Sequence, residues 1–281
     1  MNAVVSGSTV LITGAARGMG ELYARRAVRE GAKTIVLWDV DEARVDDLAR
    51  ELGSASARRG TPANVRAYVV DIADRESVAA AMTQVREDLG DPDILVNNAG
   101  IVRSSLFWEH DAERDIELTM RVNALAPMWI AREVLPAMIA DRSRPKRILN
   151  IASAAGTLAN PRMSVYASSK WAMIGWSESL RLELERSAHD HVRVTTFCPS
   201  YISTGMFAGA RGPLFTPIMT PRKAVSAAWT GMLKGTPMVM RPWTVKLAMA
   251  LRGVLPTRLW DVAADRVFHV YSSMDEFTGR K

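Results

Sequence analysis

As far as about residue 198, the apolar and polar positions of the chain follow two kinds of pattern in turn. Short, nearly continuous apolar runs are separated by longer stretches with helical periodicity. Such runs are typical of parallel strands covered on both faces, so the pattern predicts an α/β fold with a doubly wound parallel sheet. The predicted strands are 8–13, 34–38, 65–70, 93–97, 147–153 and 192–197, and the predicted helical stretches are 18–31, 41–53, 74–90, 111–141 and 164–188.

Three of these helical stretches stop at a glycine, namely Gly31, Gly53 and Gly90. Glycine commonly ends a helix because it adopts positive φ without steric cost. In a sheet of this kind a ligand binds at the carboxyl ends of the strands, so we expect the functional site there.

The pattern changes after Cys198. Residues 199–220 hold several prolines and apolar side chains without a steady period, which indicates a functional or mobile loop, and we interpret them as a substrate lid. A helix at 221–233, an apolar run at 237–240 and a helical extension at 241–281 follow. We therefore expect one domain over residues 1–281, with about seven strands and helices on both faces.

Composition is that of a soluble globular protein, with 48% hydrophobic and 23% charged residues and a single cysteine. The net charge of +6 does not indicate nucleic-acid binding, because the basic residues are scattered apart from a predicted solvated loop at 142–147. The chain shows no signal-peptide layout and no apolar run long enough to span a membrane. We expect a cytoplasmic protein.

A glycine-rich segment, TGAARGMG, follows the first strand and opens the first helix. The spacing of Gly14, Gly18 and Gly20 differs from the strict dinucleotide pattern, but the physics is the same. Glycines permit a tight turn and close backbone approach, so a pyrophosphate can lie against the helix N-terminus. The alternative is a simple turn; the position between strand and helix favours a nucleotide.

Asp39 ends the second strand, 19 residues after Gly20. A carboxylate there can accept hydrogen bonds from a ribose 2′-hydroxyl and would repel a 2′-phosphate. It can equally be an acidic helix N-cap. Arg17 favours the opposite cofactor, because it could pair with a phosphate. Since Val40 rather than a base follows Asp39, we expect NAD, with NADP as the alternative.

Tyr166 and Lys170 are one helical turn apart in YASSK. Such a pair is often a weak surface contact. The alternative interpretation is that the ammonium lowers the pKa of the phenol, which is about 10 in a free tyrosine, so that the phenol can exchange a proton near neutral pH.

The chain resembles the short-chain dehydrogenase/reductase family, which has a Rossmann-type fold, over residues 8–200. The matching elements are TGAARGMG, Asp71 in VVDIAD, NNAG, Asn123 in RVNAL, Ser153 in NIASAAG, and YASSK, in the family's order. The resemblance implies an alcohol dehydrogenase or ketone reductase with the catalytic residues Asn123, Ser153, Tyr166 and Lys170. It also implies that Asp71 contacts the adenine and that Asn97 borders the cofactor; further expected cofactor contacts are Met19, Ile72, Ala99 and Gly100.

The resemblance gives each catalytic residue a role. Tyr166 would exchange the proton of the alcohol, Ser153 would hydrogen-bond the substrate oxygen, and Lys170 would bind the nicotinamide ribose. Asn123 would hold a water that connects Lys170 to solvent. A non-catalytic dinucleotide sensor is the alternative from another class, although such a protein could lose Tyr166 or Lys170 without consequence.

One segment departs from the family pattern. The family commonly has Pro-Gly after the sixth strand, whereas this chain has Pro199-Ser200. We still expect Pro199 and Ile202 to flank the nicotinamide and Thr204 to bond its amide or phosphates.

The substrate is expected to be a lipophilic secondary or allylic alcohol or the corresponding carbonyl compound. Short segments such as LWDVDE and IASAAGTLANP are loosely similar to the sequences of the branch of retinol and 17β-hydroxysteroid dehydrogenases. Besides Ser153 and Tyr166, we expect Met206 and Phe207 to contact the substrate, with an apolar wall completed by Leu214, Phe215, Ile218 and Met219; these residues could instead pack against the tail. The family resemblance also suggests a homodimer or homotetramer.

The remaining candidate residues suggest ordinary structural roles. His189 and His191 lack further ligands, so a polar turn is the preferred interpretation and no metal is expected. Cys198 is expected to be a small buried side chain. The segment 243–260 could lie on a membrane surface, but Lys246 and Arg252 fall on different sides of a helix, so we expect a lid or subunit contact instead.

Overall fold

The computed structural model describes residues 3–279 and contains one seven-stranded sheet, in which every recorded strand pair is parallel. The strand order is β3-β2-β1-β4-β5-β6-β7. The strands are β1 (Thr9–Thr13), β2 (Thr34–Asp39), β3 (Asn64–Val69), β4 (Ile94–Asn97), β5 (Lys146–Ile151), β6 (Val192–Pro199) and β7 (Met238–Arg241). The predicted fold class is confirmed, including the number of strands.

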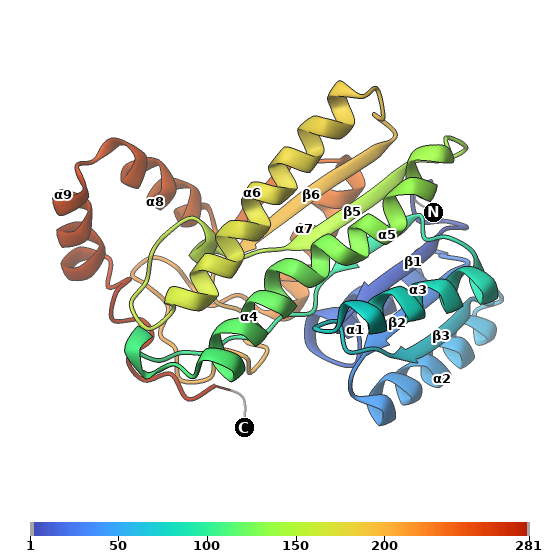
Figure 1. Ribbon diagram of the computed structural model, residues 1–281, viewed down its shortest axis with the longest axis horizontal. Coiled ribbons are helices and arrows are strands. Elements are labelled where there is room, and N and C mark those ends of the chain that lie inside the picture. The colour runs from blue at the N-terminus through green and yellow to red at the C-terminus, as the bar shows by residue number, and fades with distance from the viewer. Residues whose placement is uncertain (1–2, 280–281) are drawn as a thin grey trace.

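Helices cover both faces of this sheet (Figure 1). One apolar core joins the sheet to α1 (Gly18–Arg29), α2 (Glu42–Arg58) and α7 (Pro221–Lys234). A second core, on the other face, joins it to α3 (Arg75–Leu89), α5 (Ala126–Ala140) and α6 (Ser164–Arg186). Since the two faces are buried, the strands carry the nearly continuous apolar runs seen in the sequence.

The second helix is longer than its sequence predicts. Gly31 and Gly90 follow α1 and α3 with positive φ, as expected, but α2 continues through Gly53 to Arg58. Its buried face extends from Leu52 to Ser56, and the Ser56 hydroxyl donates to the carbonyl of Gly53 while accepting from the amide of Ala63. Packing of this last turn outweighs the helix-breaking tendency of one glycine, which costs only about 1 kcal/mol.

The predicted helical stretch 111–141 contains two π-helical turns. They span Ala112–Glu117 and Arg121–Leu125, on either side of the short α4 (Leu118–Met120), and they lead directly into α5. Local π-helical turns often occur at functional sites because they shift the direction of side chains. The second one carries Asn123.

The chain after β6 is arranged differently. Residues 200–220 form a loop with a single isolated bridge between Ile202 and Met219. After β7 come α8 (Trp243–Val254) and α9 (Thr257–Val262), which lie to one side of the layered part of the molecule (Figure 1). None of the helices within residues 3–279 combines the length and the apolarity that crossing a bilayer requires.

Candidate active site

The glycine-rich loop between β1 and α1 leaves no room for side chains at two positions. A Cβ on Gly14 would lie 2.8 Å from the Cα of Ala99, and one on Gly20 would lie 2.0 Å from the carbonyl oxygen of Gly14. Gly14 and Gly18 also have positive φ, of 63° and 62°. The loop therefore folds tightly against the end of β4 and aims the N-terminus of α1 at the carboxyl edge of the sheet, where it can hold an anion.

A cleft of about 940 Å³ runs along this edge. It is lined by most of the residues that the sequence predicts for the cofactor and the reaction: Gly14, Arg17, Gly18, Met19, Asp39, Asp71, Ile72, Ala99, Gly100, Ser153, Tyr166, Lys170, Pro199, Ile202, Thr204, Met206 and Phe207. Gly20, Asn97 and Asn123 do not line it. The structure thus brings together residues that are up to 193 positions apart, from Gly14 to Phe207. Their individual contacts with a cofactor stay predictions.

Asp39 faces the glycine-rich loop and does not cap a helix. Its Oδ2 accepts a hydrogen bond from the amide of Ala16 at 2.9 Å, and its Oδ1 accepts one from the amide of Asp41 at 3.1 Å. Asp41 is the N-cap of α2. The alternative interpretation of Asp39 as a helix cap is therefore wrong, and Asp39 lines the cleft beside the glycine-rich loop.

The structure places Asn97 differently from the prediction. Asn97 pairs with Asn150 across β4 and β5, and its Nδ2 donates to the Oδ1 of Asn150 at 2.8 Å. Asn150 in turn donates to the hydroxyl of Ser177 in α6, so the pair ties the sheet to that helix. The neighbouring Asn98 lines the cleft and donates from Nδ2 to the carbonyl of Gly14 at 3.1 Å. The alternation of side chains along a strand could have separated the roles of these two asparagines.

Tyr166 and Lys170 lie in the first two turns of α6, and both are buried. The ammonium nitrogen of Lys170 is 5.8 Å from the centroid of the Tyr166 ring and donates to the carbonyl of Ile151 at 2.9 Å. The Ser153 hydroxyl lies after β5 and accepts from the amide of Ala155 at 3.1 Å. The interpretation of the pair as a surface contact is excluded by this burial.

Burial also shifts the pKa values of Tyr166 and Lys170. It raises the pKa of Tyr166 to about 12, and a hydrogen bond with Ser153 opposes only part of this rise. Burial lowers the pKa of Lys170 to about 8. Removing the phenol from water thus penalises its anion more than the neighbouring protein groups favour it. That Lys170 and a positively charged nicotinamide together favour the anion stays a prediction.

Asn123 is held by three hydrogen bonds to protein groups, and its predicted link to a water stays a prediction. Its Oδ1 accepts from the amide of Ile101 at 2.9 Å, and its Nδ2 donates to the carbonyl of Ile101 at 2.8 Å and to the hydroxyl of Ser169 at 3.1 Å. A Cβ on Gly100 would lie 3.1 Å from the Oδ1 of Asn123 and 3.5 Å from the Nζ of Lys170. Asn123 therefore joins the loop after β4 to α6 immediately behind the lysine.

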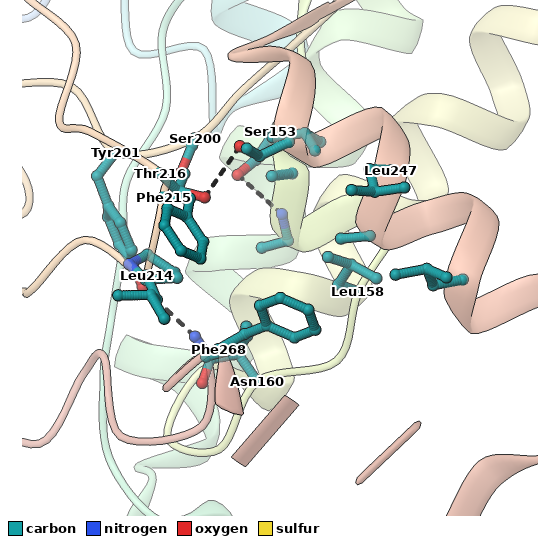
Figure 2. Close-up of a pocket in the computed structure, with 18 of the residues that line it drawn as sticks. Ser153, Leu158, Asn160, Ser200, Tyr201, Leu214, Phe215, Thr216, Leu247 and Phe268 are labelled. Carbon is teal, nitrogen blue, oxygen red and sulfur yellow. Dashed lines mark hydrogen bonds between the residues drawn. The ribbon is translucent and has the colours of Figure 1, made fainter. Parts of the chain in front are cut away.

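A second cavity, of about 380 Å³, adjoins the cleft and is mainly apolar. The two share Ser153, Ser200 and Phe207. Figure 2 shows Tyr201 and Phe215 from the loop on one side of this cavity, opposite Leu158 and Leu247. An alcohol bound here would present its oxygen to Ser153 while its carbon skeleton stayed in the apolar cavity.

The predicted apolar wall is correct only in part. Phe207, Leu214 and Phe215 line the apolar cavity, whereas Met206 lines the cleft and neither Ile218 nor Met219 lines either cavity. The C-terminal extension supplies several walls that the sequence did not assign, namely Trp243, Leu247, Leu251, Trp260, Phe268 and Val270. Only the helical spacing of Trp243, Leu247 and Leu251 signals them in the sequence.

The other candidate residues take no part in this site. Cys198 is free and buried, as expected, and burial raises its pKa to about 12. His189 and His191 lie in the turn between α6 and β6. Within residues 3–279, no group of three or more histidine, cysteine or acidic side chains is arranged to hold a metal ion.

The order and the geometry of these elements match a known family. A family model described as short chain dehydrogenase covers residues 8–213. The chain belongs to the short-chain dehydrogenase family. The sequence resemblance is thereby confirmed, and the protein is an oxidoreductase of the alcohol dehydrogenase type.

Two curated relatives of this short-chain dehydrogenase match nearly its whole length. Epidermal retinol dehydrogenase 2 of Mus musculus is 36% identical over 99% of this chain and 87% of its own. Estradiol 17-beta-dehydrogenase 11 of Rattus norvegicus is 35% identical over 94% of this chain and 85% of its own. The branch suggested by the sequence is therefore confirmed.

Solved structures of the family share the fold. A short-chain dehydrogenase from Sphingobium yanoikuyae in complex with NADPH is 30% identical, with a TM-score of 0.72 over 92% of this chain and 93% of its own. A family member from Burkholderia phymatum in complex with NAD has a TM-score of 0.77 and 24% identity over 89% of this chain and 94% of its own. The fold of this short-chain dehydrogenase binds a nicotinamide dinucleotide, and both forms of that cofactor occur among its neighbours.

Proposed function

We propose that this enzyme uses NAD to interconvert a lipophilic secondary or allylic alcohol and its ketone or aldehyde. The observation that carries the proposal is the shared boundary of the two cavities. Ser153 lies where the cleft meets an apolar cavity large enough for a bulky hydrocarbon skeleton. The names of the retinol and estradiol dehydrogenases support a substrate of this kind.

The chemistry divides between the chain and its cofactor. A nicotinamide held in the cleft would supply the acceptor or donor of the hydride that the substrate carbon exchanges. Ser153 hydrogen-bonds the substrate oxygen and holds it beside Tyr166, and the phenol exchanges the proton of that oxygen. Burial raises the pKa of Tyr166 to about 12, so the phenol is protonated at neutral pH and can donate a proton to a carbonyl oxygen. Positive charge next to the phenol would favour the anion, which is the form that accepts the proton of an alcohol.

The preference for NAD rests on Asp39. Its carboxylate is fixed by two backbone amides at the edge of the cleft, where a 2′-phosphate would meet a negative charge. Arg17 lines the same cleft and supports NADP, as does the complex of the Sphingobium relative with NADPH. We infer that the fixed carboxylate outweighs the arginine, because two backbone amides hold Asp39, whereas no hydrogen bond or ion pair of the Arg17 side chain is recorded among the described residues.

Steady-state kinetics test the proposal directly. Purified enzyme is assayed in both directions with NAD and NADP, on a panel of bulky lipophilic alcohols and carbonyl compounds and on short-chain alcohols as controls. We expect a higher kcat/KM with NAD and with bulky substrates, and Asp39→Asn should shift the preference towards NADP. Absence of turnover with all substrates and both cofactors would contradict the proposed reaction, and a preference for NADP would contradict its cofactor.

A further inference from the structure

One face of α8 carries large apolar side chains that are exposed to solvent. The side chains of Trp243, Leu247 and Val254 are 66%, 44% and 83% exposed. Their spacing of four and seven residues places them on one face of the helix, together with the exposed Ala250. Val245, on the inner side, is buried in a small core. One side of α8 therefore packs against the protein, and another side presents apolar side chains to solvent.

The basic side chains of α8 lie on different sides of the helix, as expected. Arg252 is exposed but lies against neighbouring segments: its guanidinium is 4.8 Å from the centroid of the Trp171 ring and donates to the carbonyl of Thr157 at 3.0 Å. Lys246 lies at the border of the exposed stripe of Trp243, Leu247, Ala250 and Val254, at about 60° from Trp243 around the helix axis. Since Arg252 is held on the side opposite Trp243, Lys246 is the charged side chain of α8 that borders the stripe.

The surroundings of the stripe are basic. Residues 241–258 contain Arg241, Lys246, Arg252 and Arg258 and no acidic residue. Lys246 and Arg258 are exposed, and no ion pair of either is recorded among the described residues. An apolar stripe with basic side chains at its border is the composition of an interfacial helix on an anionic membrane.

The stripe is continuous with the opening of the apolar cavity. Trp243 and Leu247 line that cavity, as do Leu214 and Phe215 of the loop. Phe215 is 73% exposed and has a φ of 60°, a conformation in which a side chain of this size is strained. A hydrogen bond of 2.9 Å between the hydroxyls of Thr216 and Thr244 joins the loop to α8 next to both aromatic rings.

We propose that the α8 face, defined as Leu214, Phe215, Trp243, Leu247 and Val254, docks on the surface of an anionic lipid bilayer. The apolar side chains would enter the boundary between headgroups and acyl chains, and Lys246 and Arg258 would contact lipid phosphates. A lipophilic alcohol would then enter the apolar cavity directly from the bilayer. This last step rests on the proposed function; the docking itself does not.

A second copy of the chain is a less suitable binding partner for the α8 face than an anionic bilayer. In a twofold symmetric contact the same patch lies on both sides, so Lys246 and Arg258 of one copy would approach the same basic residues of the other. Since no acidic side chain occurs in residues 241–258, this repulsion would have no compensation within the stripe. A bilayer rich in phosphatidylserine supplies the missing negative charge.

Flotation of the full-length enzyme with vesicles tests the docking. We expect binding to vesicles of phosphatidylcholine with 30% phosphatidylserine, and much weaker binding to phosphatidylcholine alone, on the order of the tenfold effects expected for a few basic contacts. Val254→Asp and Lys246→Glu should each weaken binding at least about tenfold. Neither residue lines a cavity, so neither change alters the walls of the catalytic site.

Two matched controls lie elsewhere on the surface. Val69→Asp places the same charge on an exposed apolar residue of β3, at the opposite edge of the sheet from β7. Lys33→Glu makes the same charge change as Lys246→Glu, between α1 and β2. Both controls should bind vesicles like the unchanged enzyme.

The remaining outcomes overturn the docking. These are no vesicle binding, equal binding to neutral vesicles, equal loss in the controls, or an oligomer that Val254→Asp dissociates without any vesicle binding. The last would identify a second copy as the occupant. If the enzyme turns over a dispersed lipophilic alcohol but does not bind vesicles, the docking proposal is wrong and the proposed function stands. If it binds vesicles but turns over no such alcohol, the proposed function is wrong and the docking proposal stands.

Discussion

The part of the chain before Cys198 and the part after it build the two halves of the active site by different physical means. In the first part, buried polar side chains are fixed by specific hydrogen bonds, as with Asn123 on Ile101 and Lys170 on Ile151. In the second part, the loop and α8 form the walls mainly by apolar contact. Hydrogen bonds of fixed geometry hold the reacting groups in place, while non-directional apolar contacts can adapt to the shape of a substrate.

The largest expected effect lies in the first part. Tyr166→Phe should lower kcat by at least about a hundredfold, since it removes the group that exchanges the proton. The dissociation constant of NADH, measured by fluorescence titration, should change little. Unchanged turnover would show that another group carries the proton and would remove the chemical distinction between the two parts.

Asn123→Ala should lower the free energy of unfolding by about 2 kcal/mol or more, measured in urea. The change leaves the amide and the carbonyl of the partly buried Ile101 without their side-chain partner, and an unpaired buried group costs about 1–3 kcal/mol. Asn64→Ala, on the exposed start of β3, is the control and should have almost no effect. If both variants were equally stable, the first part would not depend on such hydrogen bonds.

The apolar walls predict a smaller and more selective effect. Leu251→Asn should raise KM for a bulky lipophilic alcohol about tenfold, because a polar group in an apolar wall loses hydration without gaining a partner. For a short-chain alcohol, KM should change less than about twofold. Leu251→Met conserves volume and should leave both values close to the original. Equal effects on both alcohols would mean that this cavity does not select by size.

The smallest expected effect is the pH dependence contributed by Lys170. Its pKa is about 8 in the folded protein and about 10.4 in an unfolded chain. Between these values the unfolded chain binds more protons, so this group makes the protein more stable as pH rises. Compared with Lys170→Met, the unchanged enzyme should gain about 1 kcal/mol in free energy of unfolding from pH 7 to pH 9.

Tyr166 contributes with the opposite sign at higher pH. Its pKa of about 12 lies above the unfolded value of about 10, so the folded state retains the proton and stability falls as pH rises above about 10. Below pH 10 the other shifted group is Cys198, whose pKa burial raises to about 12 and which is present in both proteins. The difference between the unchanged enzyme and Lys170→Met in urea unfolding at pH 7, 8 and 9 therefore isolates Lys170. Parallel pH profiles of the two proteins would show that burial does not shift the lysine.

Where the sequence-based expectations failed, a contact beyond the helix or strand concerned was responsible. Gly53 does not end α2, because the Ser56 hydroxyl accepts a hydrogen bond from the amide of Ala63, seven residues later and just before β3. Asn97 points into the interior, because its strand pairs with the one that carries Asn150, 53 residues later. The pattern within a single helix or strand does not contain these partners.

The sequence by itself determined the α/β class, the strand order along the chain, the glycine-rich loop and the Tyr166–Lys170 turn, because periodicity, glycine conformation and helical spacing are local properties. Only the tertiary structure decided that burial raises the pKa of Tyr166, that Asn123 is held by Ile101, and that α8 and the loop after β6 enclose one apolar cavity. Burial and cavity shape depend on which distant segments meet, and that is a property of the packed chain.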